Sequence, residues 1–181
     1  MNKFYILLVI LALTGAGWWF VREVKERIPT VEDQSVAYPE LGREHIAVGA
    51  EHPSYNSNPP SSGWHYGETA KLGFYDLTEL PPPDENLIHN LEHGEIWIVY
   101  RPTIPVNVRK MLKDEFGNES LVIITPRPAN DTDIAVVAWG RVDKWNLPSA
   151  GALDTARIKD FIVRWRNRGP EKVPLAEHLR K

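Results

Sequence analysis

Three stretches of the chain concentrate β-branched and aromatic residues in the manner of strands. They are EIWIVY at 95–100, LVIIT at 121–125 and IAVVAWG at 134–140. The last is apolar almost throughout, which is typical of a central strand. The pattern predicts a sheet in the second half of the chain.

Two other segments repeat apolar residues with the period of a helix. One is expected at 107–116, ending before Gly117, and its apolar stripe is formed by Val108, Met111, Leu112 and Phe116. The other is expected from an N-cap at Asp154 to about Arg168. A few strands, two packed helices and long proline-rich loops predict an α+β domain built on a small, mainly antiparallel sheet.

The first apolar run is different, because Phe4 to Val21 contains no charged residue. At about 1.5 Å per residue, a helix of this length nearly spans a bilayer. Trp18 and Trp19 lie where an interfacial aromatic belt is expected. The run predicts one N-terminal transmembrane helix. A cleaved signal peptide is the alternative, because Gly15-Ala16-Gly17 offers a cleavage point.

The domain boundaries follow from this run and from Pro29, which ends the charged segment behind it. We expect residues 1–28 to form a membrane anchor and stalk, 29–44 a linker, and 45–181 a single domain. The positive-inside rule favours a cytoplasmic domain, because Lys3 on one flank is outnumbered on the other by Arg22, Lys25 and Arg27.

The composition excludes several kinds of partner and chemical site. The formal net charge is −3, so no basic field favours nucleic acid as a partner. The chain has no cysteine, which excludes disulfides, thiolate nucleophiles and cysteine-based metal sites. The pattern specifies no protein partner.

The strongest chemical motif is HNLEH at 89–93. In a helix over 85–93, His89 and His93 are four positions apart and share one face, so both imidazoles can reach one metal ion. Gly94 then suits the residue that ends the helix. The alternative is that His93 caps the helix while His89 is an ordinary surface residue.

The same five residues match H-x-x-E-H, a zinc-protease signature in which the glutamate is the general base. Glu92 is therefore a weak catalytic candidate. That chemistry needs a long helix in a large domain, whereas this helix is expected to end at Gly94. Glu92 can instead form hydrogen bonds around a metal ion without binding it directly.

A second motif, SNPPSSGWHYG at 57–67, predicts a rigid loop that delivers His65 as the third ligand. The alternative is a structural loop whose aromatic residues pack at the edge of the core. His52 and Met111 are candidates for a fourth ligand, although Met111 lies on an apolar stripe that favours core packing. A thioether ligand would favour copper over zinc.

These motifs resemble a family of bacterial membrane-anchored proteins called domain of unknown function 3105. Its stretches, roughly YPxxPPTSGPHY and VHNLEHGGVVxxY, correspond to Tyr55–Tyr66 and Ile88–Tyr100, and AWG and GPE follow at 138–140 and 169–171. The chain departs from it at Ser61, Trp64 and Glu95, and no histidine is lost. The resemblance implies an extracytoplasmic domain, against the charge count, and it supplies no activity.

The leading hypothesis is a single-pass cell-membrane protein whose extracytoplasmic domain binds or handles copper or zinc through His65, His89 and His93. The second is a non-catalytic interaction or scaffold domain in which the histidines are structural. The third is a metal-dependent hydrolase that uses Glu92.

Overall fold

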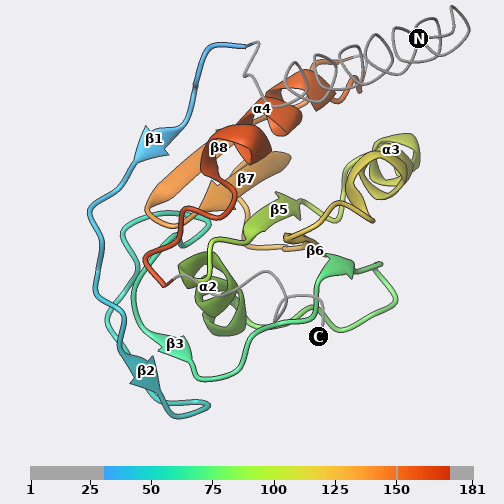
Figure 1. The fold of residues 1–181 in the computed structure, drawn as a ribbon. Helices are drawn as coiled ribbons and strands as arrows, with labels where there is room; N and C mark the ends of the chain where they lie inside the picture. Colours follow the sequence, from blue (N-terminus) through green and yellow to red (C-terminus); the bar gives the residue numbers. More distant parts are fainter. Residues whose placement is uncertain (1–30, 150, 172–181) are drawn as a thin grey trace, which may run out of the picture.

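The structure is a computed structural model and describes residues 31–149 and 151–171. These residues form a mixed sheet, a small second sheet and three helices (Figure 1). The strands are β1 (Val36–Ala37), β2 (His45–Ile46), β3 (His65–Tyr66), β4 (Gly73–Phe74), β5 (Ile96–Tyr100), β6 (Val122–Pro126), β7 (Ile134–Ala138) and β8 (Arg141–Trp145). The helices are α2 (Asp84–Glu92), α3 (Val106–Phe116) and α4 (Thr155–Trp165).

The α+β class is confirmed, but the sheet is mixed where a mainly antiparallel one was predicted. Its strand order is β1-β8-β7-β5-β6-β4. The β1–β8, β7–β8 and β5–β7 pairs are antiparallel, whereas β5–β6 and β4–β6 are parallel. The parallel pairing arises because α3 connects β5 to β6 as a crossover. Helix α2 is a third helix of the fold, in addition to the two packed helices on which the predicted fold class was based.

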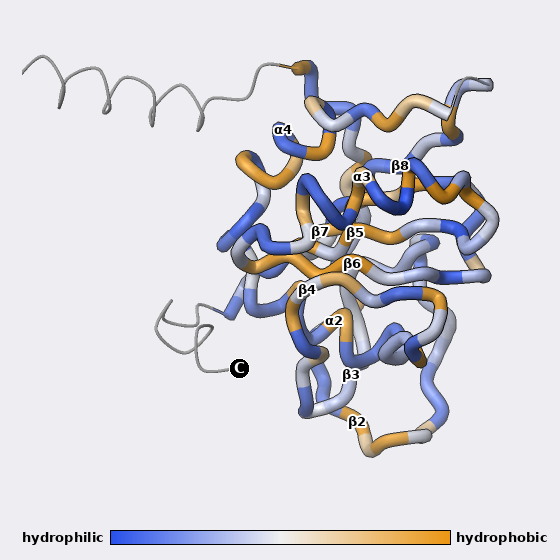
Figure 2. Tube along the Cα trace, turned by 90° about the vertical axis from the view of Figure 1, so that its right-hand side faces the viewer, coloured by the Kyte–Doolittle hydropathy of each residue, from blue (hydrophilic) through white to orange (hydrophobic). Residues whose placement is uncertain are grey.

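Both faces of the sheet are buried, which explains why its central strands are apolar throughout. One face packs with α3 and α4 around Ile98, Ile124 and Val136. The other packs with α2 through Trp97, Ile123 and Val137. Figure 2 shows the hydrophobic residues concentrated in these central strands. The sheet thus forms a packed surface that supports α2.

Helix α2 forms where its sequence has distinct start and stop signals. Pro83 occupies the N-cap position, and Asp84 and Glu85 place carboxylates in the first turn, where they are favourable with the helix dipole. The helix gives way at His93 to Gly94, whose φ of +82° is a conformation that favours glycine. This agrees with the predicted helix over 85–93.

The segment assigned to the linker contributes to the fold, because β1 at Val36–Ala37 pairs with β8. Within residues 31–149 and 151–171, no helix is long and apolar enough to cross a membrane. The predicted span at Phe4 to Val21 lies outside the described residues.

Candidate metal site

Helix α2 approaches the small second sheet (Figure 1). Four side chains come together there. His45 comes from β2, His65 from β3, and His89 and Glu92 from α2. Each offers one nitrogen or oxygen, and these atoms all lie within 4.8 Å of one another. The four residues can therefore hold a metal ion.

The parallel pairing of β2 with β3 brings the first two histidines together, because His45 is the register partner of His65. Their ring centroids lie 4.7 Å apart, and both rings are close to that of His89, at 4.8 Å for His45 and 5.0 Å for His65. When a tetrahedral ion lies about 2.0–2.1 Å from one nitrogen of each ring, the ring centroids are roughly 5 Å apart. The three rings match that arrangement.

Backbone carbonyls select the tautomer of both buried rings. Nδ1 of His65 lies 2.8 Å from the carbonyl oxygen of Gly63, and Nδ1 of His89 lies 2.8 Å from that of Tyr66. A carbonyl only accepts, so each Nδ1 carries the proton and donates it. In the neutral ring the lone pair is therefore on Nε2. A backbone partner on the other ring nitrogen is a common feature of metal-binding histidines.

Nε2 of His65 is fully buried and has no hydrogen-bond partner. It lies only 3.2 Å from Oε2 of Glu92, but the two atoms do not have the geometry of a hydrogen bond. A buried nitrogen lone pair beside a carboxylate is unfavourable by itself, because both groups are electron-rich acceptors. A cation between the two atoms, either a proton or a metal ion, removes this conflict, and three imidazoles with one carboxylate form a donor set that fits a metal ion.

Burial perturbs the two site residues of α2 in opposite directions. It lowers the pKa of His89 to about 4, with the neighbouring His93, His65 and His45 adding to the effect. Burial raises the pKa of the Glu92 carboxyl, although His65 opposes this shift. His89 is thus neutral, and able to bind a metal, well below physiological pH.

The other sequence motifs support this site. Gly140, the last residue of the AWG motif, donates its N–H to the carbonyl of Ser61 (2.9 Å), and the rings of Trp139 and His65 are nearly perpendicular. Ser62 Oγ accepts from the N–H of Leu41 (3.2 Å). Hydrogen bonds at Ser61 and Ser62 therefore hold the 57–67 loop to the AWG motif and to Leu41.

A C-terminal segment, residues 166–171, closes over the end of α2. Asn167 donates its N–H to the Gly94 carbonyl (2.7 Å), and Glu171 donates its N–H to the Glu92 carbonyl (3.1 Å). The two segments are so close that a Cβ on Gly169 would lie 2.1 Å from the backbone carbonyl oxygen of Glu92. The GPE motif thus holds the backbone of a site residue.

A family model covers this arrangement. The family described as "protein of unknown function (DUF3105)" matches residues 47–177, well over half of the chain. The chain belongs to this family. His65, His89 and Glu92 lie inside the DUF3105 match, whereas His45 lies two positions before it. No curated protein and no solved structure matches the chain.

Within this DUF3105 domain, the structure brings together two of the three histidines selected from the sequence. His93 follows the last residue of α2, and its ring centroid lies 4.5 Å from that of His89. Its Nε2 lies 3.6 Å from the Glu171 carboxylate, and it is outside the four-residue group. A ligand role for His93 stays a prediction.

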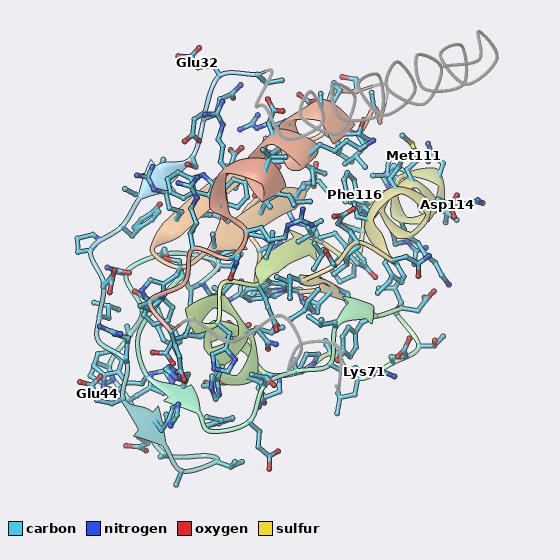
Figure 3. All side chains as sticks on the ribbon, in the orientation of Figure 1. Glu32, Glu44, Lys71, Met111, Asp114 and Phe116 are labelled. Carbon is cyan, nitrogen blue, oxygen red and sulfur yellow. The ribbon has the colours of Figure 1, made fainter. Side chains whose placement is uncertain are left out.

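The two candidates for a fourth ligand lie elsewhere. His52 is also outside the four-residue group, with Nδ1 2.8 Å from the Pro53 carbonyl and Nε2 3.2 Å from Glu85. Met111 is 38% exposed on α3, well apart from α2 (Figure 3). Its expected place in the core is wrong, because α3 buries the narrower stripe of Val108, Leu112 and Phe116.

The sequence did not single out His45, and it assigned Glu92 to hydrogen bonding around a metal ion, whereas the structure places both residues in the four-residue group. His45 lies 20 positions before His65 in a stretch without a motif, and only the strand pairing brings them together. The only available signal was that His45, like His52, lies upstream of the two motifs.

The lowered pKa of His89 predicts an acid-sensitive fold in the metal-free protein. Between the unfolded value of about 6.5 and the folded value of about 4, the unfolded chain binds the proton and the folded chain does not. Stability therefore decreases as the pH is lowered, and His89 alone accounts for a loss of roughly 2 kcal/mol between pH 7 and 5.

Urea denaturation in the presence of a chelator measures this effect. Protonation of Glu92 acts in the opposite direction, because its folded pKa is raised. The contribution of His89 is therefore taken as the difference between the wild type and His89→Gln at each pH. A difference that does not change with pH would contradict the prediction.

Proposed function

We propose that this protein is a membrane-tethered metal-binding protein whose domain holds one divalent transition-metal ion, Zn²⁺ or Cu²⁺. The ligands are His45, His65, His89 and Glu92. The observation that carries the proposal is the buried Nε2 of His65, which faces Glu92 without a hydrogen bond while Nδ1 is bound to the backbone. A histidine that only stabilised its loop would need Nδ1 alone.

The donor set limits the choice of metal. Three imidazoles and one carboxylate are ligands of borderline to hard character, and the described residues of the site include no sulfur ligand. Such a set suits Zn²⁺ and Cu²⁺, whereas Cu⁺ favours thiolate and thioether ligands. Met111 lies on α3, away from α2, so a thioether ligand has no support and the proposal is limited to Zn²⁺ and Cu²⁺.

A hydrolase that uses H-x-x-E-H has weaker support. That chemistry places both histidines on the metal and leaves the glutamate free to act as a base. Here the glutamate is inside the cluster and the second histidine, His93, is outside it. Four protein ligands also leave no vacant position on a tetrahedral ion for a substrate or a water molecule.

Tethering to the membrane is part of the proposal and rests on the uncharged run from Phe4 to Val21. We place the domain outside the cytoplasm on the basis of the resemblance to its family. Retention of the protein in carbonate-washed membranes tests the tether, and digestion by external protease in spheroplasts tests the orientation.

The test of the metal proposal is the stoichiometry and affinity of binding. Purified protein, stripped with a chelator and titrated with Zn²⁺ or Cu²⁺, is expected to bind one ion per chain. Glu92→Ala should weaken binding by about 10–100-fold, because it removes a ligand and leaves His65 facing a cavity.

His93→Ala is the matched variant, since it removes a neighbouring polar side chain from outside the four-residue group. We expect it to change the affinity less than Glu92→Ala does. The reverse order would assign the site to the three histidines of the sequence motifs. A wild-type protein that binds neither ion would leave the interaction-domain hypothesis in its place.

A further inference from the structure

The four residues of the metal site differ sharply in accessibility. The relative exposure of His65 is 0%, of Glu92 4% and of His89 6%. His45, in contrast, is exposed to solvent. An ion bound by all four would therefore be held by three buried residues and one residue that is exposed to solvent.

The supports of these ligands differ in the same way. His89 and Glu92 belong to α2, which packs on the large sheet through Leu87, Ile88 and Leu91. His45 belongs to a strand of two residues that pairs with β3 alone, whereas β3, which carries His65, is equally short but is buried and packs against α2. The neighbouring backbone adds two bonds, from His65 N–H to the Glu44 carbonyl (3.2 Å) and from Gly49 N–H to the Tyr66 hydroxyl (3.1 Å).

Short, exposed edge segments of this kind open locally at a much lower free energy than packed helices and central strands. Displacement of His45 breaks one metal–nitrogen bond and a few surface contacts. Displacement of any other ligand requires a buried side chain to leave a packed element. The first ligand to dissociate is therefore determined by the fold.

We propose that His45 is the exchangeable ligand of a transferable ion, through which the metal enters and leaves the site. This inference rests on the proposed metal-binding function and adds that the ion is cargo. In the exchange step, the bond from the ion to the ring of His45 breaks as a bond to an incoming imidazole or carboxylate donor forms. The charge and oxidation state of the ion do not change.

The incoming donor is a nitrogen or oxygen ligand carried by an acceptor protein or a small chelator. A permanent structural ion is usually enclosed by its ligands, because its role is to stabilise the fold. Here the exposed ligand is the one attached to the least supported strand, which is the arrangement that permits ligand substitution from solvent.

Chemical rescue by free imidazole distinguishes an exchangeable ligand from a buried one. Full-length protein in detergent micelles is stripped and loaded with Zn²⁺, and both the affinity and the rate of release to a chromogenic chelator are measured. His45→Ala is expected to bind one Zn²⁺ with about 10-fold lower affinity and to release it at least about 10-fold faster. Millimolar imidazole should restore most of the affinity, because the exposed position admits the free ligand.

His65→Ala is the matched variant at the buried position, where imidazole should restore little or nothing. The wild type with the same imidazole provides the baseline, and circular dichroism shows whether each variant is folded. Three results would overturn the inference: unchanged binding and release in His45→Ala, no rescue of that variant, or equal rescue of both variants. A wild type that binds no metal would instead overturn the proposed function itself.

Discussion

Replacing Gly169 by alanine is expected to lower the free energy of unfolding by about 3 kcal/mol or more, a large effect for one methyl group. The added Cβ would lie 2.1 Å from the carbonyl oxygen of Glu92 and 2.3 Å from the amide nitrogen of Gly94. Both contacts are with backbone, so no side chain can rotate to relieve them. The 166–171 segment must separate from α2 and lose its hydrogen bonds to Glu92 and Gly94.

Gly67→Ala is the matched control, because a Cβ at that position meets nothing within 4 Å and its φ is not in the left-handed region. We expect it to change stability by no more than about 0.5 kcal/mol. Urea denaturation with a chelator present, followed by tryptophan fluorescence, compares the two variants. Equal midpoints for both would show that the segment is not held against the helix in solution.

The second large effect is expected at His65. Alanine at this position should reduce the affinity for Zn²⁺ by about 100–1,000-fold, because it removes a ligand that is already oriented for binding. Nδ1 is held by the Gly63 carbonyl, and the ring is enclosed by its surroundings with no exposed surface. The free ring therefore loses little freedom when it binds an ion.

His52→Ala is the control, since it removes a half-buried histidine from a neighbouring loop that is outside the four-residue group. Isothermal titration should give near wild-type affinity for this variant. If His52→Ala lost binding and His65→Ala kept it, the site described in the structure would be wrong.

Elements with strong local signals were predictable from the sequence. The helix expected at 85–93 is found at Asp84–Glu92, and the three predicted strands agree with β5, β6 and β7 to within a few residues. The N-cap at Asp154 is confirmed by its bond from the N–H of Arg157 (3.0 Å). Prolines, glycines and capping residues act over a few positions, so they can be read without knowledge of the fold.

The features that were not predictable depend on contacts between distant segments. Strands β1 to β4 contain two residues each, too few for any periodic pattern to indicate them. Without β2, nothing indicates that His45 reaches the site. Glu92, the last residue of α2, and His93, its C-cap, are three and four positions after His89, so helical spacing places both near its face. Which of them approaches His65 depends on how the helix is rotated on the sheet.

Helix α2 is held at both of its ends. Asp84, in its first turn, accepts hydrogen bonds from Arg127, the residue that follows β6. Nη2 lies 2.8 Å from Oδ2 and Nε lies 3.0 Å from Oδ1. The far end is held by the 166–171 segment. These contacts oppose sliding and rotation of the helix. In the metal site proposed above, a fixed helix gives a fixed arrangement of donors, which disfavours large cations such as Ca²⁺ that require six to eight oxygen ligands.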